Sequence, residues 1–148
     1  MIHKHSLTIA GGLLLCGALA GMASASAADG DAIYPSQLLK RKPALQSQYT
    51  QLIKPVVAEH AWVKQIGTET PVTEVTVADT QYAVLSSCKP HDCAAQSMVS
   101  LMQPGSKQAV GALLVNKGSS FEPTGSTITW LGQPDGNQRQ FMAAYLFR

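Results

Sequence analysis

The segment CKPHDC, residues 88–93, gathers two cysteines, a histidine, a lysine and an aspartate within six positions. These residue types support several kinds of chemistry. Thiolates and imidazoles bind metal ions, paired thiols exchange electrons, and an imidazole donates or accepts hydrogen bonds. A disulfide that merely stiffens the chain is a further interpretation. The compartment, the cysteine count and the elements around the segment decide among them.

Residues 1–28 predict a secretory signal peptide. The positively charged start MIHKHS precedes the apolar run LTIAGGLLLCGALAGMA. Small residues with A-x-A spacing follow, which predicts cleavage after Ala25, Ala27 or Ala28. The apolar run is too short and too rich in glycine to predict a membrane span. We therefore expect residues 29–148 to form one exported domain, in a bacterial periplasm and without a membrane anchor.

The exported part is close to electrically neutral. Lys4 is the only charged residue of the signal peptide, which leaves ten Lys and Arg against nine Asp and Glu. This balance provides neither a basic surface for nucleic acid nor an acidic field for a cationic partner. We therefore expect no nucleic-acid partner.

Cys88 and Cys93 are the only cysteines left once Cys16 is removed with the signal peptide, so an oxidising compartment predicts a bond between them. The ring is small and its entropic contribution to stability is only about 2 kcal/mol. Its main effect is to stiffen the enclosed residues, and Pro90 adds a fixed φ. The sequence therefore predicts a rigid loop that presents His91 and Asp92 outward, ordered before any partner binds.

Three other interpretations of the loop remain open. It could be a structural staple with an incidental histidine. A zinc site would need deprotonated thiols and further ligands, and His60 is the only other histidine of the exported part. Catalytic thiol pairs normally enclose two residues rather than four. We expect no metal and no cofactor, and we expect His60 to be a surface or packing residue.

The N-terminal part of the exported chain predicts helix. In residues 34–53, Ser36 is expected to cap a first turn and Pro43 to begin a second segment. Pro55 then ends or kinks the helix. One apolar stripe at helical spacing contains Leu45, Tyr49, Leu52 and Ile53.

From residue 72 the apolar period changes to two, and five segments predict strands: VTEVTVA, QYAVLSS, AAQSMVSLM, QAVGALLVN and STITWLG. Short links, among them Asp79–Thr80 and the CKPHDC loop, favour an antiparallel meander. AVGALLV is apolar on both faces, which predicts cover on both sides of the sheet. The tail NQRQFMAAYLFR predicts a helix. The fold class is therefore α+β, a five-stranded antiparallel meander between helices in three layers, α/β/α.

CKPHDC between two strands resembles the signature loop of the Ivy family, the inhibitors of vertebrate (C-type) lysozyme, and matches it without departure. Softer similarity lies in AWVKQIGTETP and TWL, so the resemblance extends from about residue 35 onward. The family fold is a five-stranded antiparallel meander flanked by helices. By this resemblance, residues 29–148 are expected to be a single periplasmic inhibitor domain and not an enzyme.

The resemblance also implies a binding mode. The loop formed by Cys88, Lys89, Pro90, His91, Asp92 and Cys93 is expected to enter the lysozyme cleft. There His91 is the key contact with the two catalytic carboxylates, while Lys89 and Asp92 orient the loop or touch the rim. Family members can be homodimers, although no stretch here identifies a self-complementary surface. The alternatives are the cell's own lytic transglycosylases as targets, or a thiol oxidoreductase that uses Cys88 and Cys93.

Overall fold

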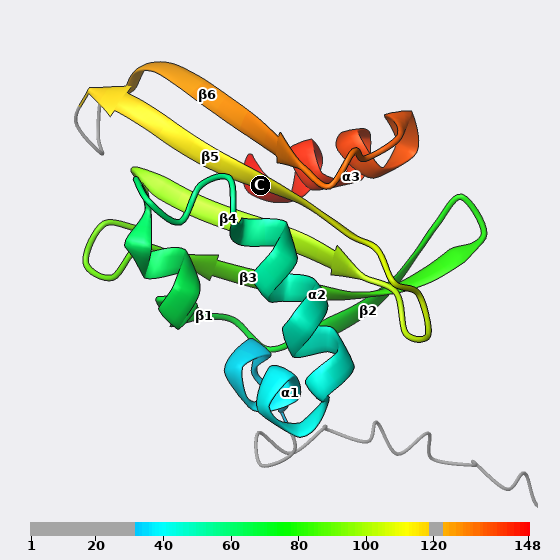
Figure 1. The fold of residues 1–148 in the computed structure, drawn as a ribbon. Helices are drawn as coiled ribbons and strands as arrows, with labels where there is room; N and C mark the ends of the chain where they lie inside the picture. The colour runs from blue at the N-terminus through cyan, green and yellow to red at the C-terminus, as the bar shows by residue number, and fades with distance from the viewer. Residues whose placement is uncertain (1–31, 119–122) are drawn as a thin grey trace, which may run out of the picture.

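The computed structural model describes residues 32–118 and 123–148, so the predicted signal peptide lies outside the described residues. Within these ranges no helix is long and apolar enough to cross a membrane. Figure 1 shows α2 crossing in front of the sheet. The elements, in chain order, are α1 (Pro35–Arg41), α2 (Pro43–Ile53), the 3-10 helix η2 (Ala61–Gln65), β1 (Thr68–Glu69), β2 (Thr73–Val77), β3 (Thr80–Cys88), β4 (Gln96–Met102), β5 (Ala109–Gly118), β6 (Pro123–Leu131) and α3 (Gly136–Leu146).

The strands form one antiparallel sheet. The order β2-β3-β4-β5-β6 is the predicted meander, in which each strand pairs with the next along the chain. The predicted number of five strands is one too few, because β1 also pairs with β3, with Thr68 opposite Cys88. A strand of two residues carries no alternation of apolar and polar positions, which explains why the sequence pattern missed it.

The first hairpin turns one residue earlier than predicted. Val77 pairs with Thr80, so the two turn residues are Ala78 and Asp79 rather than Asp79 and Thr80. Both have positive φ, 46° and 64°. Two consecutive residues of this kind form the type I′ turn that suits the twist of a two-residue hairpin.

The start of α1 also differs from the prediction. Ser36 lies inside the helix instead of capping it, because Pro35 is already the first helical residue. The carboxylate of Glu69, in β1, accepts hydrogen bonds from the backbone N–H and the hydroxyl of Ser36, both at 2.6 Å. An acidic group from a distant strand thus satisfies a free N–H of the first turn. Pro43 begins α2 and the helix ends shortly before Pro55, as predicted.

Buried side chains form one core on each side of the sheet, which confirms the three-layer arrangement. The α2 side contains Leu39, Leu45, Tyr49, Leu52, Ile53, Val56, Val63, Ile66, Leu85, Met98, Met102, Ala109, Leu113 and Leu131. The α3 side contains Val77, Tyr82, Val84, Val99, Leu101, Val110, Ala112 and Met142. The apolar strand β5 contributes to both, as its sequence predicted.

Tyr49 links α2 to η2 inside the first core. Its hydroxyl donates a hydrogen bond to the carbonyl oxygen of Val63 at 2.8 Å. Burial raises the pKa of the Tyr49 phenol above its ordinary value, and the negative charge of Glu69 raises it further. The folded protein therefore keeps this phenol neutral at pH values where the unfolded chain ionises it.

This pKa shift predicts alkaline destabilisation. The contribution is fully present below about pH 10, the pKa of an unfolded tyrosine, and the free energy of unfolding then falls by about 1.4 kcal/mol per pH unit. Tyr49→Phe should remove that slope, as measured by urea unfolding between pH 8 and 11. Tyr34→Phe, which alters an exposed phenol, is the control and should keep it. Equal slopes for the two variants would contradict the assignment.

Candidate functional site

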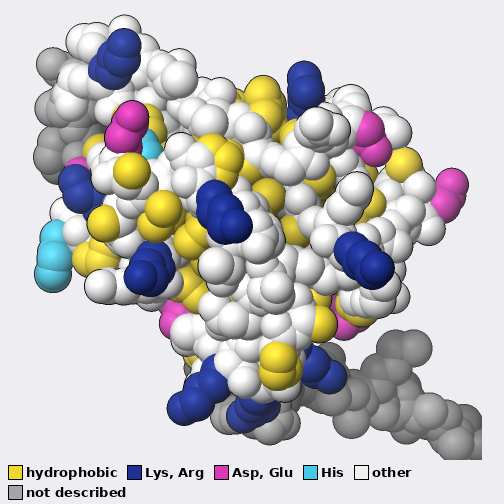
Figure 2. Space-filling view, viewed as in Figure 1, with side chains coloured by type: hydrophobic (Ala, Val, Ile, Leu, Met, Phe, Trp, Pro, Cys, Tyr) yellow, Lys and Arg dark blue, Asp and Glu magenta, His cyan; other side chains and the backbone are white. Residues whose placement is uncertain are grey.

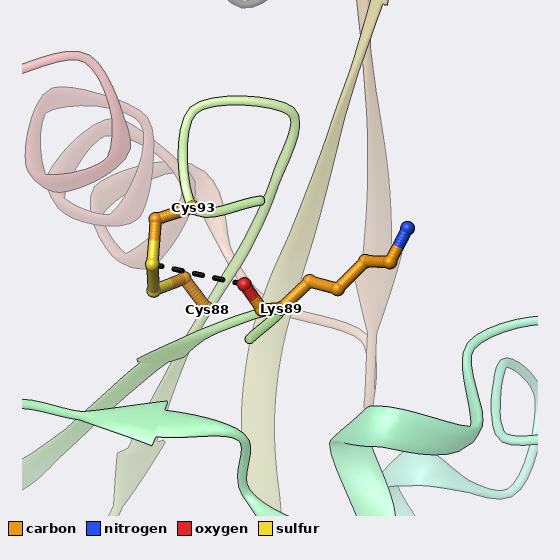
Figure 3. The surroundings of a disulfide bond; sticks show 3 residues. All are labelled: Cys88, Lys89 and Cys93. Carbon is orange, nitrogen blue, oxygen red and sulfur yellow. Dashed lines mark hydrogen bonds between the residues drawn. A yellow bond between two sulfur atoms is a disulfide. The ribbon is translucent and has the colours of Figure 1, made fainter. Parts of the chain in front are cut away.

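The CKPHDC loop connects the end of β3, at Cys88, to the turn that precedes β4. Cys88 and Cys93 form a disulfide with their Cα atoms 4.8 Å apart, which confirms the predicted pairing (Figure 3). Figure 3 also marks the contact between Cys93 Sγ and the carbonyl oxygen of Lys89, at 3.7 Å. A disulfide sulfur carries no proton, so this is a close contact and not a hydrogen bond, and the ring is closed by the disulfide alone.

A tight turn places His91 at the tip of the loop. The N–H of Asp92 donates to the carbonyl oxygen of Lys89 at 3.0 Å, with Pro90 and His91 between them. His91 has a φ of 62°. Proline followed by a residue of positive φ is typical of a type II turn, where the second position normally holds glycine or asparagine. His91 is exposed and adopts a backbone conformation that is uncommon for residues other than glycine.

Lys89 and Asp92 pair across the base of this turn. The Lys89 ammonium group lies 3.1 Å from a carboxylate oxygen of Asp92, and the two side chains are 41% and 33% exposed. A pair this exposed contributes at most about 1 kcal/mol to stability. Its effect is local, because the two charges compensate each other beside His91 and tie the two ends of the turn together.

Gln96 holds the base of the loop against η2. Its carbonyl oxygen accepts a hydrogen bond from the N–H of Lys89 at 3.0 Å. Its side-chain oxygen accepts from the indole N–H of Trp62 at 2.9 Å and lies 3.0 Å from Nδ1 of His60. Because an indole N–H only donates, this oxygen is an acceptor, and Nδ1 of His60 carries the proton. His60 is thus a packing residue beside the loop, as predicted.

Asn116, in β5, holds the segment that leads from the 88–93 loop into β4. Its side-chain amide donates to the carbonyl oxygen of Ala94 at 2.7 Å, and its backbone N–H donates to that of Ala95 at 2.8 Å. The hydroxyl of Ser126, in β6, donates to the side-chain oxygen of Asn116 at 2.8 Å. Neither Gln96 nor Asn116 was predicted from the sequence as a residue of the site. The available signal was an amide residue inside a strand, where asparagine is disfavoured.

Gly67 permits the close approach of the chain to the loop. Its φ is +55°, and a Cβ added there would lie 2.2 Å from the carbonyl oxygen of Cys88. We expect Gly67→Ala to lower the free energy of unfolding by at least about 3 kcal/mol, from unfavourable φ and steric overlap together. Thermal or urea unfolding measures this loss.

Gly105→Ala is the matched control for Gly67→Ala. Gly105 has a φ of +79°, but a Cβ added there meets no atom within 4 Å. The free energy of unfolding of Gly105→Ala should therefore fall only by the cost of the unfavourable φ, about 1 to 2 kcal/mol. Equal losses at the two glycines would show that the approach to Cys88 is not tight.

The side chains that were considered as zinc ligands, the two cysteines and His60, have other partners. Over residues 32–118 and 123–148, no group of three or more His, Cys, Asp and Glu side chains is placed to hold a metal ion. The cysteine sulfurs are bonded to each other, and His60 turns to Gln96. The arrangement presents one imidazole outward on a braced, cross-linked turn, which suits binding.

The sequence of this chain matches a known protein family over most of its length. The family described as "Inhibitor of vertebrate lysozyme (Ivy)" matches residues 44–145, which include the whole sheet and the 88–93 loop. The chain belongs to the Ivy family. The Ivy match begins in α2 and ends in α3, so it includes one helix from each side of the sheet and leaves out α1.

Individual proteins match this chain over part of its length. Two proteins named "Inhibitor of vertebrate lysozyme", from Escherichia coli K12 and Escherichia coli O157:H7, are each 38% identical over 76 residues, or 51% of this chain. The aligned part spans 46%, about half, of the length of those proteins. An uncharacterized protein of Yersinia pestis is 27% identical over 113 residues, 73% of each chain.

Proposed function

We propose that this protein is a periplasmic inhibitor of C-type lysozyme that inserts the 88–93 loop into the active-site cleft of the enzyme. One observation carries the proposal: a member of the Ivy family presents an exposed imidazole, His91, at the tip of a disulfide-closed turn. The names of the E. coli relatives supply the class of target. The protein performs no reaction in this account, and it acts by occupying a site.

The chemistry of lysozyme explains why an imidazole suits this role. Such enzymes cleave a glycosidic bond between one protonated and one ionised carboxyl group. An imidazole between these groups donates hydrogen bonds to carboxylate oxygens, and in its protonated form it also balances their charge. One charge-assisted hydrogen bond of this kind contributes about 1.5 to 3 kcal/mol. The surrounding loop blocks the path of the sugar chain at the same time.

Shape and local contacts carry the affinity in this proposal, rather than long-range attraction. Figure 2 shows Lys and Arg side chains scattered over one face, with acidic side chains near its edges and no broad acidic patch. Beside His91, the Lys89–Asp92 pair is locally neutral. We therefore expect association with a basic lysozyme to depend only modestly on salt concentration.

Export is part of the same proposal. Residues 1–28 act as the signal peptide, and the disulfide between Cys88 and Cys93 agrees with an oxidising compartment. In the periplasm the inhibitor meets lysozyme before the enzyme reaches peptidoglycan, so the function is protection of the cell wall.

The test is lysozyme turnover on peptidoglycan with the mature chain, residues 29–148, added in micromolar excess. The proposal predicts loss of turnover, and it predicts that an N-acetylglucosamine oligomer bound in the cleft competes with the inhibitor. Full turnover at this excess would refute the function. Inhibition that the oligomer leaves unchanged would refute entry into the cleft.

A further inference from the structure

The disulfide fixes the shape of the turn but not its direction. The ring closed by Cys88 and Cys93 encloses only residues 89–92, and it is anchored to the sheet through Cys88 at the end of β3. Cys93 and Ala94 are exposed and belong to a turn before β4. We call residues 93–96, which lead from the ring into β4, the returning segment. Rotation about its backbone would move the intact ring as a unit, and the imidazole of His91 with it.

Two amide side chains oppose that rotation from different elements. Asn116 binds the carbonyl oxygens of Ala94 and Ala95 through its side chain and its backbone. Gln96 ties the end of the segment to Trp62 and also pairs with the N–H of Lys89. The returning segment is therefore bonded to β5 on one side and to η2 on the other, outside the ring.

We propose that Gln96 and Asn116 are positioning residues, which together set the direction in which the loop presents His91. The functional half of this inference rests on the proposed function, because direction matters only if the loop enters a cleft. The structural half, that these amides order residues 89–95, stands independently of any target. Neither residue has to touch the partner.

The orientation of the Asn116 amide is determined by its neighbours. The hydroxyl of Ser126 donates to the amide oxygen, which leaves the amide N–H group facing the carbonyl oxygen of Ala94. Asn116→Asp preserves size and shape but places a carboxylate oxygen against that carbonyl oxygen. The change converts an attraction into a repulsion at one bond, while the strand pairing of β5 remains intact.

The first test is Asn116→Asp, with Asn137→Asp as the matched control. Asn137 is exposed on α3, so it receives the same chemical change and the same charge away from the loop. Backbone NMR order parameters for residues 89–95 should fall from about 0.85 to below about 0.6 in Asn116→Asp only. Its affinity for lysozyme should fall roughly tenfold relative to Asn137→Asp, the loss of one hydrogen bond and the gain of one repulsion. The order parameters of the backbone amides in α3 should not change.

The second test uses Gln96, where a conservative variant is available. Gln96→Met removes the acceptor for the indole N–H of Trp62, while Gln96→Glu keeps an oxygen in that place. We expect Gln96→Met to shift the fluorescence emission of Trp62, disorder residues 89–95 and weaken inhibition. Gln96→Glu should retain loop order and inhibition. Ser126→Ala is a milder variant that frees the Asn116 amide without opposing it.

These measurements separate the two proposals. If the wild-type chain does not inhibit lysozyme, the proposed function is refuted, and the order parameters alone still decide whether the amides order the loop. If the wild type inhibits, and residues 89–95 are equally ordered in Asn116→Asp, Gln96→Met and the control, the positioning role is refuted. Disorder of the loop with unchanged affinity would also refute it, because direction would then not matter for binding.

Discussion

His91→Ala should weaken the inhibition of C-type lysozyme by at least roughly 30-fold, with little change in melting temperature. The loss corresponds to about 2 kcal/mol, the usual threshold for a side chain that dominates an interface. The melting temperature should hold because the side chain is exposed, so its removal leaves no cavity in the protein. Isothermal titration or inhibition constants measure the first effect, and calorimetry measures the second.

Backbone conformation requires a control in this experiment, because His91 has positive φ. Gln133 is exposed, has a φ of 58° and follows β6 rather than β3, so Gln133→Ala tests the same backbone strain elsewhere. We expect it to leave inhibition unchanged. If His91→Ala and Gln133→Ala inhibit equally well, the imidazole makes no important contact with the enzyme.

Replacing both loop cysteines by serine should lower affinity and stability together. The ring of six residues contributes about 2 kcal/mol to stability through the unfolded state, so the melting temperature should fall by roughly 5 to 10 °C. The affinity should fall because the turn that presents His91 must then be ordered during binding. Binding measured well below the melting temperature separates the two effects.

Met142→Ala is the control for this double variant. Met142 is fully buried between α3 and the sheet, away from the loop. Its truncation to alanine should lower the free energy of unfolding by about 2 to 5 kcal/mol. It should reduce stability at least as much and leave the affinity unchanged. An affinity loss that follows stability in both variants would mean that the disulfide does not preorganise the loop.

The sequence predicted those features that lie within short stretches of the chain. The disulfide was predictable because only two cysteines remain after the predicted signal peptide, and they are five positions apart in one loop. The strands β2 to β6 followed from the apolar period of two along the sequence. The start of α2 followed from Pro43. The fixed φ of Pro90 was also predicted, and the positive φ of His91 completes the turn that Pro90 begins.

Contacts between distant stretches were not predictable in this way. Glu69 reaches Ser36 across 33 positions, and Asn116 reaches Ala94 across 22. Such pairs depend on how separate elements pack against one another, which the apolar period of a single segment does not specify. The strand β1 shares this origin, because it exists only through its pairing with β3. Membership of the Ivy family argues against a thiol oxidoreductase, while the alternative transglycosylase targets and a homodimer stay hypotheses from the sequence.

A crystal structure of the complex with lysozyme would show whether the tip of the loop occupies the catalytic centre of the enzyme. We expect the 88–93 loop inside the sugar-binding cleft, with a ring nitrogen of His91 within hydrogen-bonding distance of a catalytic carboxylate. A complex in which another surface of the inhibitor contacts the enzyme, with His91 facing solvent, would contradict it.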